Sequence, residues 1–248
     1  AGILTAKNII DASDAQGNTR VGTSAGDSFS GTDAEKNTLI GYEAGTAITD
    51  GDDNTAVGWK ALTANTTGSG NVAIGRGALV ANTTGSNNAA VGWSALTANT
   101  TGQYNTALGY QALDNNTTAD YNTAVGYQAM DANTTGTRNT SIGVYSLDVN
   151  TTGNYNTAVG AYALDANTTA DNNTAVGDAA LTANTTGAEN TALGRYALFA
   201  NTTASNNTAV GYKALEENTT GTKNTAIGAY AGDDITTANN NTVVGYAA

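Results

Sequence analysis

A 17-residue repeat runs through almost the whole chain and limits the folds that it can adopt. The unit reads N-T-A-V-G-x-x-A-L-x-x-N-T-T-G-x-x, and its opening Asn recurs every 17 residues from Asn37 to Asn241. The step from Asn18 to Asn37 is 19 residues, which predicts a two-residue insertion in the first turn. A constant short period is typical of repeat proteins, whose units pack mainly on their neighbours. We therefore divide the chain into a non-repeat segment, 1–17, and a repeat domain, 18–248, and number positions in a unit from 1 at the opening Asn.

The composition of the unit predicts strand and turn. Seventeen residues are too few for a pair of helices, and Gly at position 5 beside Thr and Val disfavours a single helix. The N-T-A-V segment is expected to form a strand, the Gly a bend, and the A-L-x-x-N-T-T segment a returning side closed by a turn. Parallel pairing of successive units then predicts an all-β fold, a parallel β-solenoid or β-roll of about fourteen coils, roughly 65 Å long.

The apolar columns of the repeat predict its core. We expect the Val, Ile or Leu before the position-5 Gly, and the Ala at position 8, to lie inside. Three units carry Gly26, Gly45 or Gly232 in place of the Leu at position 9, and in two of them Ile48 and Ile235 replace the Asn at position 12. The apolar side chain is expected to have moved along the coil to fill the same space. These units lie near the ends of the repeat, where capping units are usually atypical.

The small side chains of the unit suggest that the chain associates with itself. Ala and Val bury little area per coil, so at about 25 cal/mol per Å² a thin single-chain stack would be marginally stable. We therefore expect a parallel homotrimer, which would bury the Ala and Val columns of three chains against one another, with a monomeric solenoid as the alternative. The apolar segments 2–5 and 8–10 could also cover the open strand edge of another subunit, which predicts head-to-tail assembly into a filament. A chain cut from a longer fibre is the alternative.

The composition disfavours several classes of function. The chain has no His and no Cys, so we expect no disulfide, no zinc site, no cofactor and no enzyme. A net charge of −12 with nine Lys and Arg disfavours nucleic acid and anionic membrane surfaces as partners. No apolar run is long enough to span a membrane, and no signal peptide is recognisable. The acidic residues are expected to be scattered, solvated charges rather than a calcium-binding pattern. They include Asp114, Asp131, Asp148, Asp165, Glu189 and Glu216.

Aromatic residues follow the position-5 Gly by one or two places in many units. Stacked coils would bring them into a column whose exposed faces could bind a glycan receptor. The same column would also stabilise neighbouring strands without any ligand. The candidates for glycan or receptor contact are Tyr42, Trp59, Trp93, Tyr110, Tyr127 and Tyr212.

The N-T-T triplet at positions 12 to 14 has three interpretations. Each Asn heads a formal N-glycosylation sequon, but it could instead cap a turn or form a ladder of stacked amides. The Thr columns, represented by Thr66 and Thr67, also suit an ice-binding solenoid, although the varied dipeptide after them disfavours a flat plane. The candidate glycosylation sites are Asn65, Asn82, Asn99, Asn116, Asn133, Asn150, Asn167, Asn184, Asn201 and Asn218.

The string N-T-A-V-G-Y-Q-A at 122–129 resembles the head repeat of trimeric autotransporter adhesins, in which a short N-S-V-A-I-G-like strand precedes G-x-x-A or G-x-x-S. It is also similar to repeats in phage tail fibres. The likeness covers 18–248, although the family's repeat is shorter, so the N-T-T-G segment would form a longer side. It implies a left-handed parallel β-roll, three chains side by side and an adhesive role. The predicted function is a structural, non-enzymatic fibre, extracellular, on a cell surface or in a virion, with ice binding or carbohydrate recognition as alternatives.

Overall fold

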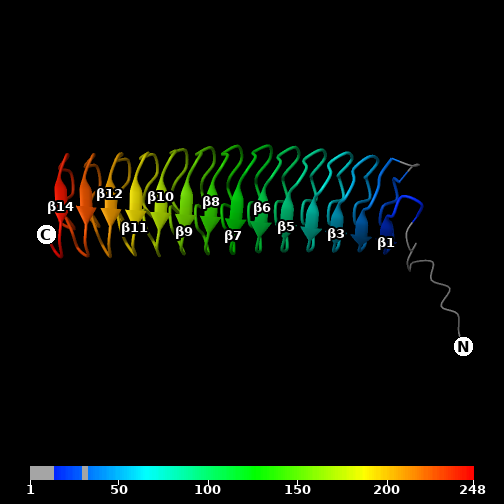
Figure 1. Cartoon of the computed structure of the whole chain (residues 1–248), viewed down its shortest axis with the longest axis horizontal. Helices are drawn as coiled ribbons and strands as arrows, with labels where there is room; N and C mark the ends of the chain where they lie inside the picture. Colours follow the sequence, from blue (N-terminus) through cyan, green and yellow to red (C-terminus); the bar gives the residue numbers. More distant parts are fainter. Residues whose placement is uncertain (1–13, 30–32) are drawn as a thin grey trace, which may run out of the picture.

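The chain folds into a rod of stacked coils, one coil for each repeat unit (Figure 1). The computed structural model describes residues 14–29 and 33–248; the segments 2–5 and 8–10 lie outside them. Fourteen three-residue strands pair in chain order to form one parallel sheet, which confirms the predicted all-β parallel β-solenoid. The strands are β1 (Thr19–Val21), β2 (Thr38–Ile40), β3 (Thr55–Val57), β4 (Val72–Ile74), β5 (Ala89–Val91), β6 (Thr106–Leu108), β7 (Thr123–Val125), β8 (Thr140–Ile142), β9 (Thr157–Val159), β10 (Thr174–Val176), β11 (Thr191–Leu193), β12 (Thr208–Val210), β13 (Thr225–Ile227) and β14 (Thr242–Val244).

Each strand is in register with the same residues of the next unit, so that Ala107 lies opposite Ala124. The rest of each coil consists of turns, yet it is also hydrogen-bonded to the next coil. For example, the Leu62 amide donates to the Ala78 carbonyl at 3.0 Å, and the Thr66 amide donates to Thr83 at 2.8 Å. The returning side is therefore bonded along the rod axis without forming a strand. None of the described residues lies in a helix with the length and hydropathy of a membrane span.

The core consists of the Ala at positions 3 and 8 and the Leu at position 9, and the prediction that the residue before the Gly lies inside is wrong. Ala107 at position 3 is 1 % exposed, whereas its neighbour Leu108 at position 4 is 47 % exposed. Successive side chains of a strand point to opposite faces, so only one of the two can face inward. The side chains that point inward are those of the Asn at position 1 and the small Ala at position 3. The Val, Ile and Leu of position 4 consequently form a column on the outer face of the sheet.

Two columns of buried Asn, which we call the asparagine ladders, run along the rod beside the apolar core. At position 1, the Asn139 backbone amide donates to Oδ1 of Asn122 at 2.9 Å, and its Nδ2 donates to the Gly153 carbonyl at 2.8 Å. At position 12, Nδ2 of Asn133 donates to Oδ1 of Asn116 at 2.9 Å and to the Gly136 carbonyl at 3.0 Å. A buried amide is destabilising unless it is hydrogen-bonded, and here each one uses the same residue of the adjacent coil.

The Gly at position 5 is required by both its conformation and its surroundings. Gly126 has φ +143°, a region open essentially to Gly alone. A Cβ on Gly126 would also lie well inside van der Waals contact with the carbonyl oxygen of Gly143 in the next coil. This bend lets the backbones of adjacent coils approach more closely than any side chain would permit.

The atypical units keep their core filled, as expected. A Cβ on Gly45 would lie 2.7 Å from the Leu39 side chain and 2.9 Å from Ile48, which is fully buried. Near the other end, a Cβ on Gly232 would lie 3.0 Å from Ile235. The Ile side chains therefore occupy the space that the Leu of position 9 fills in the regular units.

The first described coil has charged side chains at two places where later coils have Asn or Ala. Oδ1 of Asp14 accepts the Asn18 backbone amide at 2.9 Å, in the way that the preceding Asn accepts this group in later coils. Burial raises the pKa of Asp14, but the hydrogen bonds from Asn18 and Gln16 outweigh it and hold the pKa below its usual value. Arg20 replaces the position-3 Ala, and its guanidinium carbon lies 5.4 Å from the centre of the Phe29 ring. Asp14 thus continues the first asparagine ladder by one residue.

A matched pair of Gly substitutions separates backbone conformation from steric contact. Gly126→Ala should lower the free energy of unfolding by on the order of 3 kcal/mol, because Ala is strained at this φ and clashes with the next coil. A Cβ on Gly136 would also meet the carbonyl oxygen of the next coil, at Gly153, but the φ of Gly136 is not positive. Ala119 and Ala170 at the same position show that the coils can shift to admit this Cβ, so Gly136→Ala should cost under about 1 kcal/mol. Urea unfolding followed by circular dichroism measures both; equal losses would contradict the conformational argument.

Asn133→Asp tests the asparagine ladders. The carboxylate has no N–H to donate to Asn116 Oδ1 or to the Gly136 carbonyl, so we expect a loss of about 3 kcal/mol or more in urea unfolding. The control Asn172→Asp makes the same chemical change at an exposed turn position and should change stability by less than about 0.5 kcal/mol. A small effect at both positions would show that the ladder contributes little.

Candidate functional site

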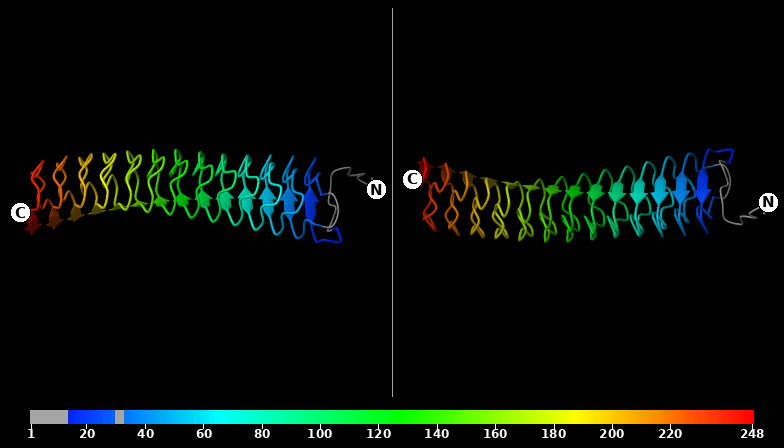
Figure 2. Two further views of the ribbon diagram at one scale, coloured as in Figure 1. Left: turned by 90° about the horizontal axis from the view of Figure 1, so that it is seen from above. Right: turned by 90° about the horizontal axis from the view of Figure 1, so that it is seen from below.

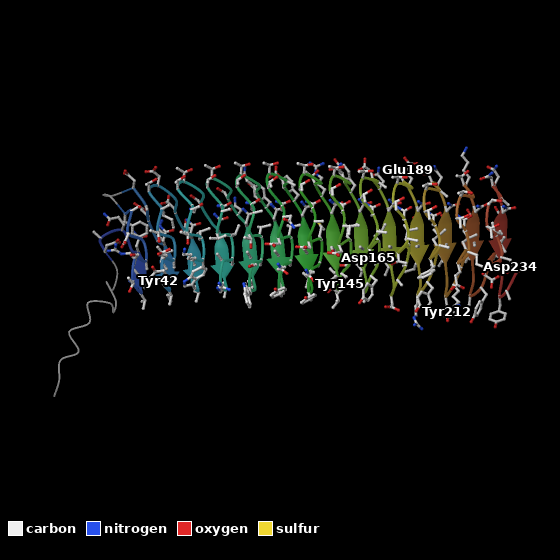
Figure 3. The ribbon with its side chains drawn as sticks, turned by 180° about the vertical axis from the view of Figure 1, so that it is seen from behind. Tyr42, Tyr145, Asp165, Glu189, Tyr212 and Asp234 are labelled. Atoms are coloured by element: carbon white, nitrogen blue, oxygen red, sulfur yellow. The ribbon has the colours of Figure 1, made fainter. Side chains whose placement is uncertain are left out.

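The variable positions of the repeat gather on the two edges of the rod. Figure 3 shows Tyr42, Tyr145 and Tyr212 along the edge at the carboxyl ends of the strands, and Glu189 along the opposite edge. We call the first the aromatic edge; it carries positions 6 and 7 of each unit, which directly follow the position-5 Gly. Chemical variety is allowed here because these side chains point into solvent rather than into the narrow coil.

Part of the predicted aromatic column is a continuous stack. The ring centroids of Trp93 and Tyr110 are 5.6 Å apart, those of Tyr110 and Tyr127 are 5.2 Å apart, and those of Tyr127 and Tyr145 are 5.4 Å apart. Tyr145 in turn stacks on Tyr162 at 5.6 Å. The structure thus brings together Trp93, Tyr110 and Tyr127 of the predicted contact residues.

The other predicted aromatics lie elsewhere on the same edge. Tyr212 pairs with Tyr230 at 5.3 Å in a separate group nearer the carboxyl terminus. A hydrogen bond with Glu43 raises the pKa of Tyr42. Trp59 belongs to the arrangement around Arg76 described below.

Stacking limits what the aromatic column can bind. Tyr110 and Tyr127 are nearly parallel, with an interplanar angle of 8°, so each covers a face of the other. Sugar rings pack on exposed aromatic faces. The faces that Tyr110 and Tyr127 turn toward each other are covered and cannot bind a sugar. The middle of the stack therefore stabilises adjacent coils in the way that cross-strand aromatic pairs do.

Arg76 interrupts the aromatic column between Trp59 and Trp93. Its guanidinium carbon lies 4.8 Å from the Trp59 ring centre and 4.9 Å from that of Trp93, within the range of cation–π attraction. Gly77 follows Arg76 at position 7, where the adjacent coils have Lys60 and Ser94. The missing side chain leaves an open cavity of about 270 Å³. Its lining is Trp59, Lys60, Arg76, Gly77, Val80, Trp93, Ser94 and Thr97, and we call it the tryptophan cavity.

The acidic residues are not scattered as expected, because four of them occupy position 10 in successive coils. Asp114, Asp131, Asp148 and Asp165 recur every 17 residues and are half-buried. Burial, followed by the charges of Asp114 and Asp148, raises the pKa of Asp131 to about 6. Burial and the charge of Asp148 raise the pKa of Asp165 to about 6 as well. No group of described residues has the arrangement of a metal site.

The N-T-T triplets lie on the returning side, and their Asn residues form the second asparagine ladder. All ten sequon asparagines are fully buried. Nδ2 of Asn82, for example, donates to Asn65 Oδ1 at 2.8 Å and to the Gly85 carbonyl at 2.9 Å. The amide nitrogen that would carry a glycan is therefore inaccessible once the coil has folded.

The two Thr columns beside this ladder differ from each other. Oγ1 of Thr66 donates to the carbonyl of Thr83 in the next coil at 3.1 Å, whereas Thr67 is exposed. The hydroxyls at position 13 thus stabilise the stack, and only position 14 presents its side chain to solvent.

A second aromatic stack at position 17 was not anticipated. Tyr104 and Tyr121 are parallel with ring centroids 5.0 Å apart. Arg138 then lies between Tyr121 and Tyr155, at 5.7 and 5.5 Å from their ring centres, and donates to the Tyr155 hydroxyl at 2.8 Å. The 17-residue spacing of these residues was the signal that would have revealed it.

Comparison of the chain with protein-family models, with curated proteins and with solved structures finds no match. What the chain does must therefore be argued from its own surface.

The aspartate column predicts an unusual pH dependence. Because the folded-state pKa of Asp131 and Asp165 lies above the unfolded value of 3.8, their neutral forms favour the folded state. This stability is fully present below about pH 3.8 and is lost as the pH rises through about 6. The free energy of unfolding should therefore rise as the pH is lowered from 7 to 5, by on the order of 1 kcal/mol per group after solvent screening. A higher urea midpoint at pH 5 than at pH 7 would show this rise.

Asp131→Asn should weaken this dependence, because the amide does not titrate, while Asp165 still does. Asp53→Asn, at an exposed turn position, is the control and should keep the wild-type slope. A urea midpoint that falls or stays level from pH 7 to pH 5 would contradict the electrostatic interpretation.

Proposed function

We propose that this chain is a structural, non-enzymatic rod that associates side by side with further copies of itself through the outer face of its sheet. The observation that carries the proposal is the apolar column at position 4. Its larger members remain between 38 and 47 % exposed in the single chain. They are Ile40, Ile74, Leu108, Ile142, Leu193 and Ile227.

This column is long, continuous and unusual for a protein surface. Every strand from β2 to β13 contributes a Val, Ile or Leu at position 4, beside the residue at position 2, which is Thr in most strands. Scattered exposed apolar residues are ordinary, but an apolar patch that runs the length of a molecule indicates an interaction site. A second copy of the same sheet is an occupant that matches it in length and spacing.

The shape of the rod favours winding of several chains. Figure 2 shows that the strands turn gradually about the long axis, so the outer face follows a shallow helical path. Chains that keep this face in contact along their length must wind around one another. The resemblance to the head repeats of trimeric adhesins and to phage tail-fibre repeats supports three chains and an extracellular or virion fibre.

The asparagine ladders and backbone bonds between coils support a stiff shaft. Each coil is bonded to the next at several points around its circumference, in the sheet, on the returning side and through both amide columns. Such a rod is suited to hold two points at a fixed distance rather than to change conformation. Head-to-tail joining of rods into a filament is compatible with this function.

Ice binding fits the surface less well. An ice-binding plane needs flat ranks of accessible side chains, whereas the sheet turns along the rod and the position-13 hydroxyls donate to backbone carbonyls. Thermal hysteresis of the purified protein would favour this alternative over the structural one.

Charges placed on the outer face should prevent association. A triple variant, Leu108→Lys with Val125→Lys and Ile142→Lys, adds three cations to the position-4 column, where burial against another chain would be costly. The control Thr118→Lys with Thr135→Lys and Thr152→Lys adds the same charges to the exposed position 14. Light scattering with size exclusion should give a multimer for wild type and control, and a monomer for the position-4 variant. A monomeric wild type would refute lateral association.

A further inference from the structure

The tryptophan cavity combines an unpaired cation with two indole rings. Among the described residues, the Arg76 guanidinium makes cation–π contacts with Trp59 and Trp93 but no ion pair or hydrogen bond. Arg195, in contrast, pairs with Asp178 at 3.0 Å, and Arg138 donates to a Tyr hydroxyl. A guanidinium carries five N–H donors and is suited to bidentate recognition of a carboxylate. Arg76 is thus the cation of this edge that is prepared for an external anion.

The surrounding charges favour an anion at this point, although the whole chain is acidic. Lys60 also lines the cavity; it lies 4.8 Å from the Trp59 ring centre and pairs with Glu43 at 3.4 Å. Because Glu43 already neutralises Lys60, the positive charge of Arg76 remains uncompensated. The two charged residues that line the cavity, Lys60 and Arg76, are both cations, although the net charge of the chain is −12.

The other lining groups indicate what the anion is attached to. Val80 and the indoles offer apolar surface, while Ser94 offers a hydroxyl. A sugar ring has an apolar face and several hydroxyls, so it matches both kinds of surface at once. A cavity of about 270 Å³ is at the lower limit for ligand pockets, a size suited to one or two sugar rings.

From these observations we propose that the tryptophan cavity binds an acidic sugar, with Arg76 pairing with the carboxylate of a uronic acid residue and the cavity walls contacting its ring. This site extends the proposed function by giving the rod a specific ligand. It does not depend on lateral association, because all of its lining residues come from one chain. Failure of one proposal therefore leaves the other standing.

Intrinsic fluorescence tests the site directly, because the chain has two Trp residues and both line the cavity. The probes are methyl glucuronoside and methyl glucoside, which share one ring and differ in the carboxylate at C6. We expect a saturable fluorescence change with the glucuronoside and binding weaker by about tenfold or more with the glucoside. No saturable change with the glucuronoside, or equal affinity for the two sugars, would overturn the proposal.

Two variants assign the effect to Arg76. Arg76→Gln should weaken glucuronoside binding by about tenfold or more while circular dichroism stays unchanged. Arg138→Gln, which also removes a guanidinium from between two aromatic rings, should bind like wild type. Unchanged affinity in Arg76→Gln would refute its role. An acetylated hexaglutamate peptide is the last arm: tighter binding of this peptide than of the glucuronoside would replace the sugar by an acidic protein segment.

Discussion

Hydrogen bonding between stacked Asn side chains is the interaction on which the rest of this structure depends. In the position-12 ladder, each Asn from Asn82 to Asn201 donates to the same residue of one adjacent coil and accepts from that of the other, so its bonds are complete only if the period stays constant. The exception illustrates the rule. Ile235 stands where the ladder would continue after Asn218, and Oδ1 of Asn218 is left without a partner. A change of period would leave buried amides unpaired, which costs free energy, so hydrogen bonding as well as packing favours a constant 17-residue repeat.

The narrow interior decides what the outer surface looks like. Two amide columns, two Ala columns and one Leu column fill each coil, which leaves no room for a further β-branched side chain. The Val, Ile and Leu of position 4 are therefore placed on the outer face, where β propensity favours them but no core receives them. The same constraint that stabilises the single chain thus produces an apolar face that further chains can cover.

The residues that differ most between repeat units lie along the edges of the rod. Side chains at positions 6, 7, 10 and 17 contact solvent and one another rather than the buried amides, so substitution there leaves the ladders intact. Similar neighbours become aromatic stacks, as with Tyr110 and Tyr127, or a column of aspartates with raised pKa, as around Asp131. A residue without a side chain leaves a gap, as Gly77 does between Lys60 and Ser94. A site on such a rod is therefore a local departure from the repeat.

The sequence by itself determined the parallel solenoid and its period, because a 17-residue unit rich in Gly and Thr is too short for two helices and pairs with the same residues of the next unit. It also determined the filling of the atypical units by Ile48 and Ile235, because an apolar residue lost from one column reappears in another. It did not determine which side of the strand faces inward, since Ala107 and Leu108 are both apolar and alternation permits either phase. Nor did it show that Asn65 is buried, that the aspartates share one column, or that Arg76 lies between two indoles. Those features depend on how the coil closes in three dimensions, which sets the width of its interior and the side chains that meet across adjacent coils.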